Sequence, residues 1–210
     1  MNEIAEIANF VEGQLADDQT GHDFSHIKRV VKLAEQLSDE IPSSNQMIVL
    51  TAAYLHDVID DKLVKDTNKQ KNLVIDKLSE LDFSSEYINQ IMNIIEHMSY
   101  SKNLTNHYQL DINGQIVQDA DRLDAIGAIG IARAFYFGGH FGDAMYNIDQ
   151  LPRTNMDKKE YRKHTTVINH FYEKLFKLPD LMNTKTARKL AAQRKKYMEN
   201  FVNEFKNEWQ

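Results

Sequence analysis

Residues 47–61, which read MIVLTAAYLHDVIDD, join an apolar run directly to a group of acidic side chains. From Met47 to Leu55 the run is apolar nearly all round a helix, which is typical of a buried central helix. The run ends in His56 and Asp57, so two polar side chains are expected at the end of a buried helix. Because a buried imidazole and a buried carboxylate both need a partner, a metal ion that binds both would satisfy them.

A second histidine, His26, occupies a similarly apolar context earlier in the chain. The helix that contains it is expected to begin near Asp23 or Ser25, since Asp and Ser are both favoured as N-caps. The apolar stripe that runs from Ile27 to Leu37 shares a face with His26. His26 is therefore expected in a first helical turn at the edge of the core, where a pocket can open.

Asp121 is the fourth polar group in an apolar context, and it lies in residues 110–137, where glycine and alanine recur. Small residues permit close contact between helices. The glycines indicate tight packing and not a phosphate-binding loop, because no strand precedes them and no Walker pattern is present. The predicted metal ligands are thus two imidazoles and two carboxylates: His26, His56, Asp57 and Asp121. This mixed set suits one divalent ion such as Mn²⁺, Ni²⁺, Fe²⁺, Co²⁺ or Zn²⁺, with Mg²⁺ less favoured because of the histidines.

Two simpler interpretations of these residues need no metal. Taken alone, the His56-Asp57 pair is better explained as a capped helix end with a hydrogen-bonded histidine. A helical scaffold without metal is the wider version of that interpretation, and it requires four buried polar side chains to find other partners. The number and type of polar groups, taken together with His26 and Asp121, favour the metal site.

Composition favours a helical protein without disulfides. The 210 residues are 42% hydrophobic, include only three prolines and eight glycines, and contain no cysteine. A sizeable core is therefore available, helices are favoured throughout, and any metal takes nitrogen and oxygen ligands. The net charge of −6 argues against a nucleic-acid polymer as partner. An acidic N-terminus and the lack of a long apolar run predict a cytoplasmic protein without membrane contact, and a homodimer is left open.

Hydrophobic periodicity predicts an all-α fold, with one domain over residues 1–210. Its metal-binding core is expected at about residues 20–130, followed by a C-terminal helical part at about 157–207. Residues 64–71 are expected to form a loop that leads into a helix, residues 138–143 to form a flexible break, and the stretch from there to residue 158 to lie on the surface. The helical segments are expected at residues 3–15, about 23–37, 47–55, 73–81, 84–98, within 110–137, at 159–176 and at about 184–205.

Six further polar residues are candidates for roles around the predicted metal. Asp60 and Asp61 follow Asp57 by three and four residues, so either can orient an attacking water or protonate a leaving group. Arg29 lies one turn after His26 and is a candidate phosphate contact. The remaining three, His97, Asp124 and His22, are candidate substrate contacts. Each also has a structural interpretation: His97 can be a hydrogen-bonded core histidine, Asp124 can support the metal ligands, and His22 can be a solvated loop residue.

The order and spacing of His26, His56-Asp57 and Asp121 resemble the H…HD…D signature of the HD-domain superfamily of metal-dependent phosphohydrolases. Several flanking stretches are similar to its bacterial YedJ/YpgQ-like subgroup, so the resemblance covers nearly the whole chain. These stretches are GHDFSH at residues 21–26, HDVIDD at 56–61, SYS at 99–101, DADRLDAIG at 119–127, HFYEKL at 170–175 and LMNT at 181–184.

The resemblance implies an all-helical HD-domain bundle with additional C-terminal helices, and a nucleotide or another phosphate ester as substrate. Similarity to the subgroup points to nucleoside triphosphates, with release of pyrophosphate. The pair Asp60-Asp61 resembles the acidic pair that assists water attack in guanosine tetraphosphate hydrolases, where Glu-Asp is typical. Two alternatives stay open: a nucleotide-sensing module that keeps the metal site but has little turnover, and a hydrolase of guanosine tetraphosphate or of nucleoside monophosphates.

Overall fold

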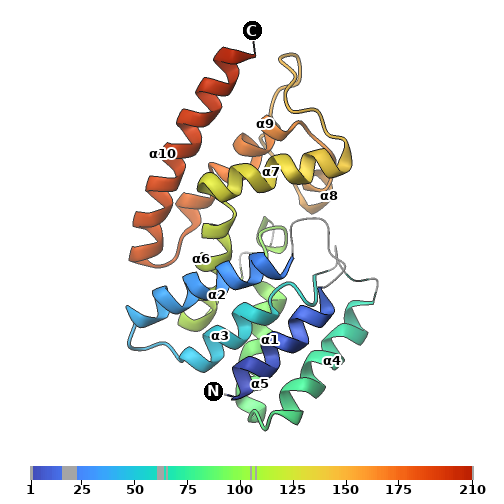
Figure 1. Cartoon of the computed structure of the whole chain (residues 1–210), viewed down its shortest axis with the longest axis vertical. Coiled ribbons are helices and arrows are strands. Elements are labelled where there is room, and N and C mark those ends of the chain that lie inside the picture. The colour runs from blue at the N-terminus through green and yellow to red at the C-terminus, as the bar shows by residue number, and fades with distance from the viewer. Residues whose placement is uncertain are drawn as a thin grey trace. The chain divides into compact units, whose positions relative to one another are not determined.

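The computed structural model describes residues 2–15, 23–60, 64, 66–104, 106 and 108–209, and these residues form helices and connecting turns without any strand (Figure 1). This confirms the predicted all-α class. The chain divides into two compact units, Met1–Ala120 and Asp121–Gln210, and the division falls within helix α6. The expected single domain stays a prediction. None of the helices described here is long and apolar enough to cross a membrane.

The first unit is organised around α3, as the apolar run predicted. Val49, Ala52 and Ala53 on this helix are fully buried, and α3 contacts the neighbouring helices α1, α2 and α5. The elements of this unit are α1 (Asn2–Gln14), α2 (Phe24–Asp39), α3 (Gln46–Leu55), α4 (Thr67–Glu80), α5 (Ser85–His97), the short 3₁₀ helix η1 (Lys102–Leu104) and the first part of α6 (Ile112–Asp124).

Side-chain caps set where the helices of this unit begin. Asp23 caps α2, since its carboxylate accepts a hydrogen bond of 2.9 Å from the backbone N–H of His26. Asn45 caps α3, and its own N–H donates to Asn113 Oδ1 at 2.7 Å, which links α3 to α6. The cap at Asp23 confirms the first of the two predicted start positions and puts His26 in the first turn of α2.

Helix α4 begins earlier than predicted. The sequence-based expectation was a loop over residues 64–71, but α4 starts at Thr67. Asp66 supplies its cap by accepting from the N–H of Lys69 at 2.9 Å. The first turns of α4 are polar because they face solvent, and Lys and Gln are good helix formers whatever their polarity. Polarity alone was therefore a poor guide to the start of this helix.

The second unit is built around a cluster of aromatic rings. Phe135 contacts Phe171, Phe201 and Phe205, with ring centroids 5.7–6.5 Å apart. The elements of this unit are the end of α6, α7 (Gly127–Phe141), α8 (Lys158–Tyr161), α9 (Val167–His170), the π-helical segment η2 (Phe171–Leu175), the 3₁₀ helix η3 (Leu178–Leu181) and α10 (Lys185–Glu208). The C-terminal helices expected from the sequence are thus confirmed.

Two boundaries in the second unit differ from the prediction. The single helix expected at residues 159–176 is interrupted, because Thr166 caps a new helix start by accepting from the N–H of Asn169. The break expected over residues 138–143 begins later than predicted, because α7 continues through Gly138 and Gly139 to Phe141. The helix ends at Gly142, whose φ of 73° is left-handed and favours glycine.

Two glycines on α7 should respond oppositely to alanine. A Cβ at Gly130 would lie 2.2 Å from the carbonyl oxygen of Ala125, whereas a Cβ at Gly139 would meet nothing within 4 Å. We expect Gly130→Ala to lower the free energy of unfolding by about 1–3 kcal/mol, because backbone must move to relieve the clash. Gly139→Ala should raise it by about 0.5–1 kcal/mol, through the lower entropy of the unfolded chain. Urea unfolding of both variants checks this; equal effects of the same sign would contradict it.

Candidate metal centre

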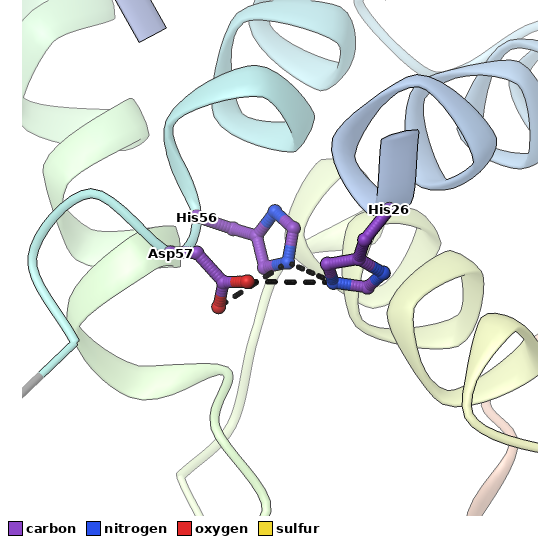
Figure 2. A group of neighbouring side chains, drawn as sticks. All are labelled: His26, His56 and Asp57. Carbon is purple, nitrogen blue, oxygen red and sulfur yellow. Dashed lines mark hydrogen bonds and ion pairs between the residues drawn. The ribbon is translucent and has the colours of Figure 1, made fainter. Parts of the chain in front are cut away.

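Three of the predicted ligands converge in the first unit. His26 Nε2 lies 3.2 Å from His56 Nε2 and 3.4 Å from Asp57 Oδ2, and His56 Nε2 lies 3.5 Å from Asp57 Oδ1. Figure 2 shows the three side chains pointing toward one another. They are 1%, 6% and 6% exposed, respectively. Within the described part of the chain, this is the one group of three or more such side chains suitably placed to hold a metal ion.

Two packed helices bring these residues together. His26 comes from the capped first turn of α2, and His56 is the C-cap of α3. The chain then turns sharply after α3, with the N–H of Val58 donating to the carbonyl of Leu55 at 3.1 Å. Because α2 and α3 pack against each other, the start of one helix and the end of the other meet. The turn aims Asp57 at the same point.

The imidazole of His56 is oriented for metal binding by its other nitrogen. His56 Nδ1 lies 2.8 Å from the carbonyl oxygen of Ala53. A carbonyl oxygen only accepts hydrogen bonds, so Nδ1 carries the proton and Nε2 presents its lone pair to His26 and Asp57. A hydrogen bond of this kind is the usual support of a metal-binding histidine, because it holds both the tautomer and the ring orientation.

The distances within this group fit a common metal ion. Ligands bound at about 2.1 Å to an octahedral ion lie about 3 Å apart, which is close to the separations of the three side chains. Two imidazole nitrogens and a carboxylate are a donor set suited to Mn²⁺, Fe²⁺, Ni²⁺, Co²⁺ or Zn²⁺. A divalent ion would also neutralise the buried negative charge of Asp57. The group can therefore hold a metal ion, and its three ligands leave further coordination positions open.

Five other candidate residues stay predictions. Asp121 is half-buried and is the first residue of the second unit. Asp60 is half-buried and follows the turn, where its N–H donates to the carbonyl of Asp57 at 3.0 Å. Arg29 is half-buried on α2, one turn after His26. Asp61 and His22 lie outside the described residues.

The two remaining candidates have partners of their own. His97 ends α5, where its Nδ1 lies 2.8 Å from the carbonyl of Asn93 and its ring lies 4.3 Å from that of Tyr108. Asp124 is buried and accepts a hydrogen bond of 2.7 Å from Arg133. These contacts give both residues a structural function, and their part in substrate binding stays a prediction. The Ala53 carbonyl was missed, because a backbone group leaves no residue-type signal in the sequence.

Comparison with known proteins shows the family of this chain. The HD domain family model matches residues 23–126, a range that contains all four predicted metal ligands. The chain belongs to the HD-domain superfamily of metal-dependent phosphohydrolases.

Its relatives match it almost from end to end. The chain is 36% identical over 209 residues to protein YpgQ of Bacillus subtilis (strain 168), covering 99% of this chain and 94% of that relative. A crystal structure of a Lactobacillus plantarum protein is 44% identical, with a TM-score of 0.90 and coverage of 99% and 97%. The crystal structure of Bacillus subtilis YpgQ in complex with ADP is 35% identical, with a TM-score of 0.78 and coverage of 98% and 97%. An HD-superfamily hydrolase of Bacillus thuringiensis is 40% identical, with a TM-score of 0.78 and coverage of 99% and 97%.

Proposed function

We propose that this protein hydrolyses nucleoside or deoxynucleoside triphosphates and releases pyrophosphate. The observation that carries the proposal is the buried convergence of His26, His56 and Asp57, with side-chain separations of 3.2–3.5 Å, in a chain of the HD-domain superfamily. Asp121, which completes the sequence motif, is proposed as the fourth ligand. A bound divalent ion would supply a water of lowered pKa and neutralise charge on the phosphate.

The residues near the proposed ligands handle protons and phosphate charge in this proposal. Asp60 and Asp61 orient the attacking water or protonate the leaving group, since both follow Asp57 within one helical turn in the sequence. Arg29, one turn after His26, contacts a phosphate oxygen. His22, His97 and Asp124 are proposed to contact the substrate or to support these residues.

A nucleotide is proposed as substrate on two grounds. A relative that is 35% identical over 98% of this chain, Bacillus subtilis YpgQ, has been crystallised with ADP. The YpgQ-like motif stretches also extend over most of the chain, from residue 21 to residue 184. A triphosphate is preferred to a diphosphate because attack at the α-phosphorus of a triphosphate releases pyrophosphate in one step.

A hydrolysis screen tests this function. The protein would be supplied with Mn²⁺, Ni²⁺, Co²⁺, Zn²⁺ or Mg²⁺ and offered nucleoside and deoxynucleoside triphosphates, guanosine tetraphosphate and nucleoside monophosphates. We expect pyrophosphate from triphosphates, with Mn²⁺ well above Mg²⁺, because histidine ligands favour the softer ion. Phosphate from monophosphates alone would make the protein a nucleotidase. Metal binding without turnover of any of these compounds would favour the nucleotide-sensing module.

A further inference from the structure

A groove of about 590 Å³ lies in the second unit, between the π-helical segment and one face of α10. Its volume is within the range of small-molecule sites. Tyr172 and Phe176 form one wall, and buried Val202 lines the base. The α10 side carries Lys195, Lys196, Glu199, Asn200 and Asn203. The groove therefore combines an aromatic wall with a row of polar side chains.

The aromatic wall is held in place by local contacts. The N–H of Phe176 donates to the carbonyl of Phe171 at 2.9 Å, an i to i−5 bond that widens the turn. The rings of Tyr172 and Phe176 meet edge to face, with centroids 5.2 Å apart. Lys206 donates to the Tyr172 hydroxyl at 2.9 Å. Single π-helical turns often accompany functional sites, and here the turn sets two rings along a groove.

Some basic side chains of α10 donate hydrogen bonds to backbone carbonyls, and others line the groove. Arg188 donates to the carbonyls of Met182 and Asn183, and Arg194 donates to that of Leu123. Among the described residues, Lys195 forms one ion pair, a long one of 3.7 Å with the exposed carboxylate of Asp180. Residues 185–196 carry six basic and no acidic side chains in a chain of net charge −6. The lysines at the groove are thus available to an anion.

Lys196 makes no ion pair with any residue that the structure describes, although Glu199 is only one turn away. Asn203 is seven residues further along α10, so its position is about 10 Å from that of Lys196. The groove thus has cations at one end, the Glu199 carboxylate in the middle and carboxamides at the other end. A nucleotide has a matching order of groups, with an anionic phosphate at one end and a base with hydrogen-bond donors and acceptors at the other.

The face of a tyrosine or phenylalanine ring stacks on nucleobases of every kind. Tyr172 and Phe176 are half-buried, and Lys206 Nζ lies over one face of the Tyr172 ring, 4.6 Å from its centroid.

We propose that this groove binds a purine nucleoside monophosphate. Lys195 and Lys196 contact the phosphate, Tyr172 and Phe176 stack on the base, and Glu199 accepts hydrogen bonds from an exocyclic amine and ring N–H. Guanine presents both donors side by side, so GMP is the best probe. The groove shares no residue with the proposed metal centre, and this inference does not depend on the proposed hydrolysis.

Equilibrium dialysis of labelled GMP against the full chain carrying His56→Ala, with chelator present, isolates the groove from the metal centre. We expect saturable binding of one GMP per chain. The double change Lys195→Ala, Lys196→Ala should weaken it at least tenfold, because two charge-assisted contacts are lost. Lys189→Ala, on the same helix but outside the groove, should change the affinity less than twofold. Circular dichroism checks that each variant is folded.

A second variant separates stacking from simple charge attraction. Tyr172→Leu should weaken GMP at least fivefold while leaving competition by orthophosphate unchanged, because only the base meets the ring. The inference is overturned if His56→Ala protein shows no saturable GMP binding. It is also overturned if Lys189→Ala weakens binding as much as the groove variants, or if orthophosphate binds as tightly as GMP.

Discussion

Asp57→Asn is expected to lower kcat/KM for triphosphate hydrolysis by about a thousandfold or more, since it removes the one charged group among the three converged side chains. Asp57 is 3.4 and 3.5 Å from the Nε2 atoms of His26 and His56. An amide has nearly the same shape but offers a divalent ion no negative charge. The apparent affinity for Mn²⁺, measured by calorimetry, should fall with the activity. The fold should persist, because removing a buried charge in the absence of metal costs little.

The matched control is His140→Ala, which removes an exposed imidazole on α7. It should leave metal affinity and activity within about twofold of the unchanged protein, as a surface substitution remote from special contacts does. Asp121→Asn tests the proposed fourth ligand in the same assay, and we expect weaker Mn²⁺ binding. Full activity of Asp57→Asn at low Mn²⁺ would contradict the metal centre outright.

The second large effect concerns stability. Glu173→Ala is expected to lower the free energy of unfolding by about 3 kcal/mol, because it leaves the Arg153 guanidinium without its counter-ion. Glu173 is 1% exposed. It accepts from the backbone N–H and the Nε of Arg153 at 3.0 Å each, from the Arg153 Nη2 at 2.5 Å, and from the Thr165 hydroxyl at 3.3 Å. Urea unfolding followed by circular dichroism measures the loss.

An exposed ion pair in the same region provides the control. Glu160 pairs with Lys163 at the surface, so Glu160→Ala should cost no more than about 0.5 kcal/mol. In Arg153→Met, Glu173→Leu, both charges are replaced by apolar groups, and much of the lost stability should return. Equal losses in the buried and exposed single variants would show that burial has no part in the effect.

The Glu173–Arg153 pair should also give unfolding a characteristic pH dependence. Burial alone raises the pKa of Glu173, but the hydrogen bonds and positive charge of Arg153 outweigh it, so the pKa lies below its ordinary value. A carboxyl with a lower pKa in the folded state stabilises the fold above its unfolded pKa. That contribution is lost as the pH falls through the unfolded and then the folded value. The unchanged protein should therefore lose more stability than Glu173→Ala between about pH 5 and pH 3.

Several features of the fold followed from short-range rules that can be read along the chain. The cap Asp23 accepts from the N–H of His26, three residues further on, so residue type and position were enough to place it. The run from Met47 to Leu55 predicted a buried central helix because it is apolar nearly all round. The sequence also limited the chemical type of any metal ligand, since it contains no cysteine and places imidazoles and a carboxylate at that helix end.

Other features depend on which distant segments pack together, and no local pattern encodes that. Arg153 pairs with Glu173, twenty residues away, and no residue close to Arg153 in the sequence indicates that partner. The interruption before α9 arises where Thr166 caps a new helix, and the backbone widens into a π turn at η2, directly after α9. Helical periodicity continued across both, since it registers which side chains are apolar and not which backbone bonds form.

The candidate metal centre shows both contributions in one place. The sequence by itself determined which residues carry metal-binding atoms and that His26 and His56 stand at helix ends, because caps and hydrophobic periodicity act over a few residues. Only the tertiary structure decided that the two Nε2 atoms lie 3.2 Å apart and that the Ala53 carbonyl orients one of them. The physical reason is that the packing of α2 on α3 sets the distance between the two Nε2 atoms. The backbone carbonyls are chemically alike along the chain, so only the folded structure determines which of them contacts His56 Nδ1.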